Sequence, residues 1–320
     1  MHEGDLGRPT GPSAGTTPRR TPACTGGVSA PGSVRLRETW GALASVVAPR
    51  SVRVAAEKAG SPFLAGGSLR TNDGTRLHCV DAGRGRPLVM LPGFSQTVAQ
   101  FRRQVEDLSG DFRVIALDHR GHGRSDKPAH GYRVSRLAAD LRDLILALDL
   151  HDVALLGHSM GCAVAWCYWD LFDGDRVGAL ILVDQPAVIA TDLVAPEYAR
   201  AVGAVFDAET AFGIAAGLRG EDAVATSRAI VERMHTPAMS PQDVAWITAQ
   251  NMLLPREYAA ALLLDHYGND WRDVLPRLDV PTLVIGVRPV SSRRSRPRGS
   301  PRASPAPRCA SFPRTNAEAI

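Results

Sequence analysis

A serine framed by two glycines is the residue of this chain with the plainest chemical use. The stretch "LLGHSMGCAVAW" at residues 155–166 contains the pattern G-x-S-x-G, centred on Ser159. In that pattern the serine attacks a carbonyl carbon after a neighbouring base has taken its hydroxyl proton. The motif therefore predicts Ser159 as a nucleophile and raises the question of which histidine serves it.

A nucleophile of this kind also needs hydrogen-bond donors for the oxyanion that forms on the attacked carbonyl. One main-chain donor directly follows the serine, which indicates the N–H of Met160. The second comes from the loop after an earlier strand, here "LPGFSQT" at residues 91–97. Pro92 has no N–H and Gly93 permits close approach of the backbone. We therefore expect the amides of Phe94 and Met160 to form the oxyanion hole.

The elements that must position these groups alternate along the chain as short strands and helices. Ser159 falls between a predicted strand at 153–157 and a helix that starts near Met160, so a tight turn would lift its hydroxyl above the sheet. Another amphipathic helix is predicted over 135–150, with Ser135 as its N-cap. A hairpin around the Asn-Asp-Gly turn and apolar strands are predicted within 68–83, 86–93, 112–118, 179–184 and 282–286. Apolar strands separated by helices predict a parallel sheet covered on both faces.

Composition divides the chain into three parts. Residues 1–33 are rich in Gly, Pro, Thr and Ser, and we expect residues 1–62 to be a largely disordered extension with at most a short helix within 34–58. Residues 63–287 form the predicted domain, in which the long Ala-rich insertion at about 186–270 would fold as a helical cap over the site. The Arg-, Pro- and Ser-rich residues 288–320 are expected to be a disordered tail.

Four motifs resemble those of the α/β-hydrolase superfamily, in its branch of cofactor-free haloperoxidases, perhydrolases and small esterases. They are "LPGF", "LDHRGHGRSDKP", "GHSMG" and "DWRDVLPRLDVPTLVIG", and the resemblance covers about residues 66–287. It implies an α/β-hydrolase fold with a helical cap, a serine nucleophile, no cofactor and no metal. His119 and His122 in the second motif are expected to pack their loop and not to act as a base.

The family places nucleophile, acid and histidine in that order, with the histidine after the last strand. Some members carry the acid at the end of the strand that matches 179–184, which makes Asp184 a candidate to orient the histidine. Closing the strand and capping the next segment is an equally good role for Asp184. After Gly286 the sequence has no histidine and no carboxylate before Glu318. The expected base, and with it the last strand and helix, are therefore predicted to be missing.

The unusual composition of the C-terminal residues suggests why the histidine base is missing. Arginine outnumbers lysine 35 to 2, as a GC-rich coding sequence would give, and residues 288–313 look like such DNA translated out of frame. We hypothesise a frameshift near codon 287, which resequencing of that region tests. His266 is the better of two upstream substitutes for the base and His235 the weaker, although packing is the simpler role for both.

The distribution of charge and the cysteine content indicate which binding partners and which cellular compartment to expect. The formal net charge is +4, but residues 63–287 carry −7, and the excess of arginine lies at the two ends. The basic tail has no aromatic residues interleaved among its arginines and no helical periodicity, so we expect no nucleic-acid partner. No apolar run approaches a membrane span, and we expect no membrane partner. Five cysteines without metal-type spacing favour a reducing cytoplasm.

Together these patterns predict a serine-dependent hydrolase of a small ester or related acyl substrate, impaired because the triad histidine is absent. One alternative is a cofactor-free haloperoxidase or perhydrolase that uses the same serine. Another is an inactive, frameshifted remnant of a hydrolase. Serine at the elbow argues against epoxide hydrolase and haloalkane dehalogenase chemistry, for which related folds use aspartate. The sequence defines neither the substrate nor the oligomeric state.

Overall fold

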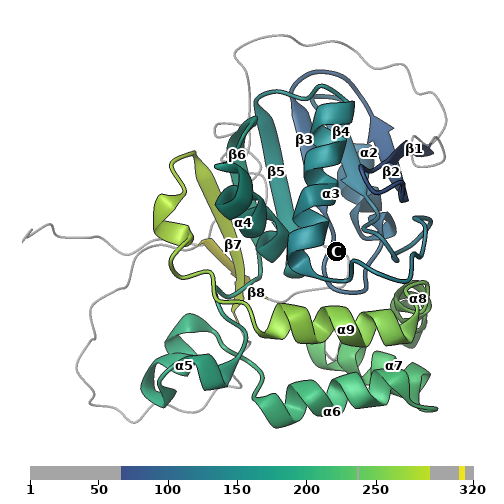
Figure 1. Cartoon of the computed structure of the whole chain (residues 1–320), viewed down its shortest axis with the longest axis vertical. Coiled ribbons are helices and arrows are strands. Elements are labelled where there is room, and N and C mark those ends of the chain that lie inside the picture. The colour runs from purple at the N-terminus through teal and green to yellow at the C-terminus, as the bar shows by residue number, and fades with distance from the viewer. Residues whose placement is uncertain (1–65, 236–237, 289–309, 314–320) are drawn as a thin grey trace, which may run out of the picture.

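The computed structural model describes residues 66–235, 238–288 and 310–313, whose strands form one mostly parallel sheet (Figure 1). The order across the sheet is β1-β2-β4-β3-β5-β6-β7-β8. β2 pairs antiparallel with β1 and β4, and the other neighbouring strands pair in parallel. This confirms the predicted fold class. The strands are β1 Gly66–Arg70, β2 Arg76–Ala82, β3 Pro87–Leu91, β4 Arg113–Leu117, β5 Val153–His158, β6 Val177–Val183, β7 Thr282–Arg288 and β8 Ala310–Pro313.

Helices cover both faces of the sheet because its central strands are apolar on both sides. α3 (Val134–Ala147) and α4 (Met160–Phe172) pack in front of the sheet in Figure 1. The shorter α2 (Arg102–Leu108) belongs to the core on the opposite face. Successive side chains of β5 point to opposite faces of the sheet, so that Leu155 packs with α3 and α4 while Ala154 packs with α2.

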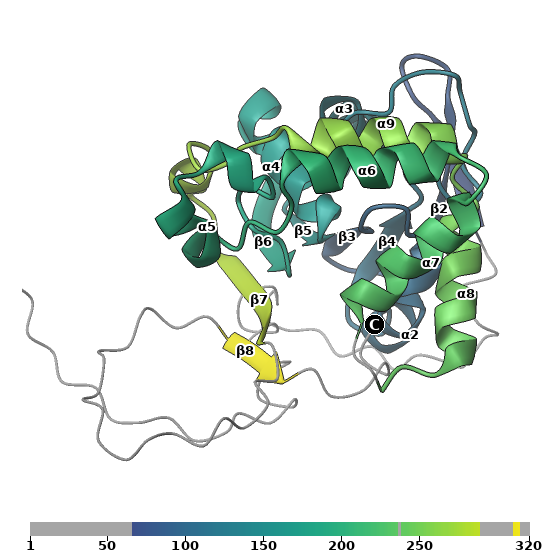
Figure 2. The same ribbon diagram turned by 90° about the horizontal axis from the view of Figure 1, so that it is seen from below.

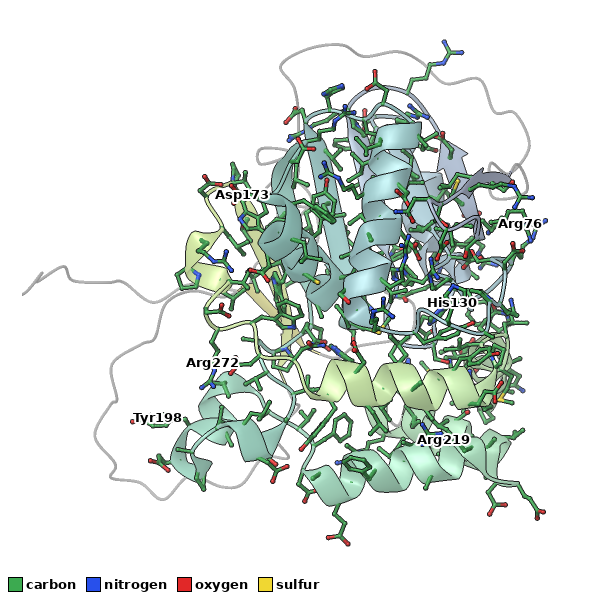
Figure 3. All side chains as sticks on the ribbon, in the orientation of Figure 1. Arg76, His130, Asp173, Tyr198, Arg219 and Arg272 are labelled. Carbon is green, nitrogen blue, oxygen red and sulfur yellow. The ribbon has the colours of Figure 1, made fainter. Side chains whose placement is uncertain are left out.

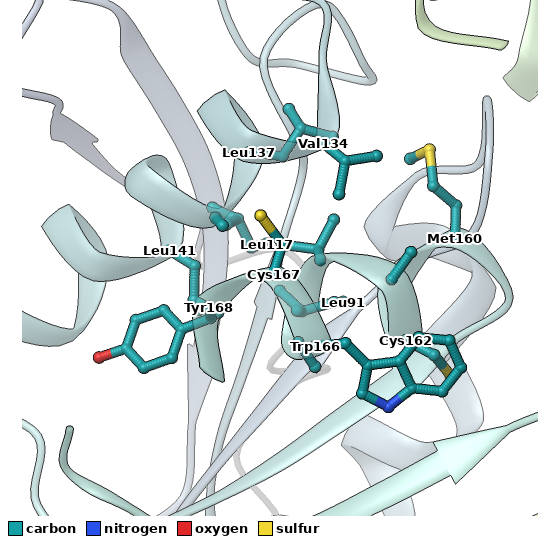
Figure 4. Packing of buried hydrophobic residues seen from close by; sticks show 14 of the residues in the cluster. Leu91, Leu117, Val134, Leu137, Leu141, Met160, Cys162, Trp166, Cys167 and Tyr168 are labelled. Atoms are coloured by element: carbon teal, nitrogen blue, oxygen red, sulfur yellow. The ribbon is translucent and has the colours of Figure 1, made fainter. Parts of the chain in front are cut away.

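The core beneath α4 anchors the start of that helix. Cys162 and Cys167 of α4 are buried and form no disulfide, as expected of small core residues. Figure 4 shows them among apolar side chains of α3, α4 and the central strands, including Leu91, Leu117 and Trp166. Because α4 is held on this side by close packing, its first residue has a fixed position at the carboxyl end of β5.

The start of α3 differs from the prediction. The helix begins at Val134 and its N-cap is Arg133, whose side chain makes no capping hydrogen bond. Instead, the N–H of Val134 donates to Asp265 Oδ2 at 2.7 Å. The expectation that Ser135 caps this helix is therefore wrong, because a carboxylate from a distant helix satisfies the free N–H.

Five helices lie between β6 and β7 and gather at the lower end of the molecule in Figure 1, the end from which Figure 2 views it. α6 packs along α9, and α7 contacts both α6 and α8. Tyr198 of α5 points away from the molecule in Figure 3 and is 61% exposed. The helical character predicted for the insertion at 186–270 is thereby confirmed. The helices are α5 Pro196–Val202, α6 Ala208–Arg219, α7 Ala223–Met234, α8 Pro241–Asn251 and α9 Arg256–Tyr267.

The C-terminal edge of the sheet corrects one expectation. β8 pairs in parallel with β7, with Ile285 opposite Ala310 and Arg288 opposite Pro313. The last strand is thus present as four residues, so for Ala310–Pro313 the predicted disordered tail is wrong. The physical reason is that the free edge of β7 offers unpaired N–H and C=O groups, which an extended segment can satisfy without a sequence motif. The disorder predicted for 1–62 and for the rest of the tail falls outside the described residues.

A search of the described helices for a membrane-spanning segment finds none with the necessary length and apolar character.

Candidate active site

Ser159 occupies the turn between β5 and α4, as the sequence predicts. Its backbone has φ 49° and ψ −124°, a conformation that residues other than glycine rarely adopt. The turn is held by two main-chain hydrogen bonds. The N–H of Ser159 donates to the carbonyl of Val183 at 2.8 Å, and its carbonyl accepts from the N–H of Cys162 at 2.7 Å. The serine is therefore fixed in a strained position at the carboxyl edge of the sheet.

The two glycines of the motif are required by close backbone packing. A Cβ on Gly157 would lie 2.5 Å from the main-chain nitrogen of Cys162. A Cβ on Gly161 would overlap the carbonyl oxygen of Leu91 at the end of β3. Because main-chain atoms fill both places, a side chain at either position would push α4 away from the sheet.

The loop after β3 meets the elbow directly. A Cβ built on Gly93 would lie 3.2 Å from Cβ of Ser159, and the N–H of Gln96 donates to the carbonyl of Gly93 at 3.1 Å. The N–H groups of Phe94 and Met160 form no hydrogen bond within the described parts of the chain. Met160 begins α4, so its N–H has no partner inside the helix. Two free main-chain donors are therefore available on the two segments that meet at Ser159.

The side chain of Ser159 has a partner that the sequence analysis did not identify. Its Oγ donates to Oε1 of Gln185 across 3.4 Å. Gln185 directly follows Asp184, so the only signal in the sequence was its place just after the strand. Among the residues that the structure describes, no histidine is hydrogen-bonded to this hydroxyl.

Asp184 lies at the end of β6, with φ 52° and its N–H donating to the carbonyl of Ile285 at 2.8 Å. Its side chain is exposed, and within the described ranges no histidine hydrogen-bonds to it. Burial lowers the pKa of His158 to about 4, and the charge of Asp184 opposes that shift. The structure thus brings Asp184 near the elbow but not against a triad histidine, and its orienting role stays a prediction.

The two substitute histidines occupy different surroundings. His266 in α9 is buried, and burial alone lowers its pKa to about 4. His235 follows α7, and its Nδ1 lies 2.6 Å from the carbonyl of Val231. Because a carbonyl only accepts, Nδ1 carries a proton and Nε2 is left to accept one. His235 also contributes to lowering the pKa of His158, and within the described residues neither His235 nor His266 is hydrogen-bonded to Ser159.

His119 and His122 pack inside their loop, in agreement with the sequence analysis. Both are completely buried, with ring centroids 5.7 Å apart. Burial lowers their pKa values to about 3 and about 4. Nδ1 of His122 lies 2.9 Å from the carbonyl of Arg120. Neither ring is exposed to a substrate, and both are neutral near pH 7.

Comparison with known proteins gives matches over the same region. Residues 86–288 match the alpha/beta hydrolase fold family. The chain is 30% identical over 215 residues to a putative non-heme chloroperoxidase of Synechocystis sp., covering 65% of this chain and 75% of that protein. It is 40% identical over 123 residues to epoxide hydrolase 4 of Mus musculus, covering 36% of this chain and 33% of the relative. This and the two other relatives at the head of the comparison are matched over less than half of their length.

Solved structures show the same similarity. An esterase from Exiguobacterium antarcticum superposes with a TM-score of 0.63 at 26% identity, over 69% of this chain and 81% of that one. A bromoperoxidase from Bacillus anthracis superposes with a TM-score of 0.64 at 21% identity, over the same shares of the two chains. At that lower identity the similarity concerns the fold alone.

Proposed function

Because the chain belongs to the alpha/beta hydrolase fold family, we propose that it is a serine hydrolase of small esters or related acyl compounds, slowed by the lack of a triad histidine. The strained turn at Ser159, in contact with the loop that carries the N–H of Phe94, is the observation that carries the proposal. The expected small-molecule partner and cytoplasmic location are parts of the same proposal, which includes neither nucleic acid nor membrane.

In the proposed reaction, Oγ of Ser159 attacks the acyl carbon and the carbonyl oxygen becomes an oxyanion. The N–H groups of Phe94 and Met160 donate to this oxyanion, which stabilises the tetrahedral intermediate more than the planar substrate. The intermediate expels the alcohol and leaves an acyl-serine, which water then hydrolyses to the acid and the free serine.

The removal of the proton from Oγ of Ser159 is the slow part of the proposed reaction. A triad histidine would take it and then pass it to the leaving alcohol. Without that base, solvent accepts the proton and supplies one to the alcohol, so both proton transfers are slow. An oxyanion hole and substrate binding alone leave a rate about 10³–10⁴-fold above that in water. Asp184 would orient a histidine only if a C-terminal segment supplied one.

Serine as the nucleophile favours acyl substrates over epoxides, although several relatives are named epoxide hydrolases. An aspartate that opens an epoxide forms an ester, which water can cleave. Ser159 would form an ether, which water does not cleave under mild conditions. A catalytic cycle at Ser159 therefore requires an acyl-enzyme.

Peracid formation at the same serine is the second candidate, favoured by the 215-residue match to a putative non-heme chloroperoxidase. Here hydrogen peroxide replaces water as the attacking group on the acyl-serine. The products are a peracid and the free serine, and the peracid then oxidises a halide ion and is reduced to the carboxylic acid.

Hydrolysis of p-nitrophenyl acetate by the purified chain tests the proposal. We expect slow turnover above the buffer rate that Ser159→Ala abolishes and that Ser135→Ala, a change at an exposed helical serine, leaves unchanged. Halogenation that requires peroxide and acetate, and that is lost in Ser159→Ala, would favour the peracid reaction. Equal rates for the wild type, Ser159→Ala and buffer would show an inactive remnant.

A further inference from the structure

A partly buried arginine joins the cap helices to the loop that carries Phe94. Arg256, the first residue of α9, donates from Nη2 to Oγ of Ser95 at 2.9 Å. Its Nη1 donates to Oγ of Ser227 in α7 at 3.2 Å, and its Nε donates to the carbonyl of Leu254 at 2.8 Å. One side chain thus connects two cap helices to the residue that follows Phe94.

Arg256 has no carboxylate partner in the described part of the chain, since all of its hydrogen-bond acceptors are neutral oxygens. Burial lowers its pKa to about 10, and no nearby charge opposes this shift. Arg120, which is fully buried, instead forms two hydrogen bonds of 2.7 Å with Asp140. Among the described residues, Arg256 therefore forms no ion pair that would offset its partial burial, and the contacts it does make are hydrogen bonds that join the cap to the loop.

Ser95, which accepts from Arg256, is the strained residue of the loop. It is completely buried and has φ 60°, which is unfavourable for a residue with a side chain. Its hydroxyl donates to the carbonyl of Asn251 at 3.2 Å and accepts from Arg256, so both partners belong to the cap. Ser95 lies inside the turn that the hydrogen bond from Gln96 to Gly93 closes. Fixing Ser95 therefore fixes the turn and, with it, the direction of the N–H of Phe94.

We propose that Arg256 is a positioning residue that holds the oxyanion loop in its donating geometry by clamping Ser95 against the cap. The inference rests on the proposed function, because only an acyl reaction at Ser159 needs that donor. It gives the cap a part in the chemistry, because the geometry of the oxyanion hole then depends on how α8 and α9 pack against the loop.

Affinity for a small boronic acid tests the clamp, because the acid forms a tetrahedral adduct with a nucleophilic serine and places an oxygen in the oxyanion hole. We expect Arg256→Gln and Ser95→Ala each to weaken this binding about 10- to 100-fold, less than the loss of a whole oxyanion donor. The double variant should be no weaker than the worse single variant, since both break one contact. For p-nitrophenyl acetate, kcat should fall while KM changes little.

Two further variants complete the comparison. Arg256→Lys keeps the charge but cannot span both serine hydroxyls, so it should restore only part of the lost affinity. Arg228→Gln, at an exposed arginine of α7 paired with Glu232, should bind the boronic acid like the wild type.

The possible results separate the clamp from the proposed function. If Ser159→Ala abolishes boronic acid binding while Arg256→Gln and Ser95→Ala both keep wild-type affinity, the clamp is overturned and the serine hydrolase proposal stands. If Ser159→Ala binds as well as the wild type, the proposed function fails and the clamp fails with it. Should Arg256→Gln not fold, Ser95→Ala decides the question, because it removes only the hydroxyl.

Discussion

The elbow between β5 and α4 and the edge formed by β7 and β8 belong to one sheet, yet they are built very differently. At the elbow, Leu155 is completely buried and the turn at Ser159 is hydrogen-bonded to the neighbouring strand. At the edge, Val284 of β7 is 45% exposed and β8 pairs through only four residues. The family's nucleophile belongs to the first region and its histidine to the second.

This difference shows how the parts of such a site can be separated. The proposed nucleophile and oxyanion donors lie on two short segments, 91–97 and 153–162, which approach each other closely at Gly93 and Gly161. The base depends on a segment more than 120 residues further along the chain, which packs on the edge of the sheet. Changes confined to that segment can remove the base and leave the nucleophile in place.

The largest effect should come from rebuilding the edge. We predict that replacing residues 289–320 by a family-type strand, histidine and helix raises p-nitrophenyl acetate turnover about 10²–10⁴-fold, the usual contribution of general acid–base catalysis. The matched control carries alanine in place of the introduced histidine. Equal rates for the two replacements would mean that the introduced histidine does not act as a base for Ser159, which would contradict the prediction.

Adding a single methyl group at Gly161 should destabilise the turn between β5 and α4. In Gly161→Ala the new Cβ meets the carbonyl oxygen of Leu91, so α4 must move off the sheet. We predict a loss of about 2–4 kcal/mol in the free energy of unfolding, measured by urea denaturation.

The control for this change is Gly213→Ala in the exposed part of α6, where a Cβ meets nothing within 4 Å. It should stabilise the protein by about 0.5–1 kcal/mol, because alanine is the better helix former. An unchanged urea midpoint for Gly161→Ala would show that α4 and the end of β3 leave room for a methyl group, which would contradict the close packing at the elbow.

Acid should destabilise the elbow and the cap, because the buried histidines lie in the elbow, its supporting loops and the cap. Burial lowers the pKa values of His119, His122, His158 and His266 to between about 3 and about 4. In the unfolded chain histidine titrates near 6.5. Stability should therefore be constant above about pH 6.5 and fall as the pH drops toward 4, because the unfolded chain then binds more protons.

His266→Gln should reduce this slope by at most about 1.4 kcal/mol per pH unit, the value of one proton. Urea denaturation of the wild type and of His266→Gln between pH 4 and 7 measures the two slopes. A slope that His266→Gln does not alter would show that this imidazole binds its proton as readily in the folded protein as in the unfolded chain.

The parts of the structure that could be predicted from the sequence are those encoded by neighbouring residues. The G-x-S-x-G motif placed the turn of Ser159, and the apolar runs placed the central strands, because both patterns act over a few residues. The contact of Arg256 with Ser95 joins positions 161 residues apart, and that of Val134 with Asp265 joins positions 131 apart. No local pattern marks such pairs. β8 was missed because pairing with a free edge needs only an extended backbone.

Peptide mapping by mass spectrometry after treatment with a fluorophosphonate tests most directly whether Ser159 is a nucleophile beside an oxyanion hole. The account predicts one adduct per chain on the Ser159 peptide, formed slowly in the wild type and absent in Ser159→Ala. An adduct that forms equally in Ser159→Ala, or a Ser159 peptide that stays unmodified after long exposure, would contradict it.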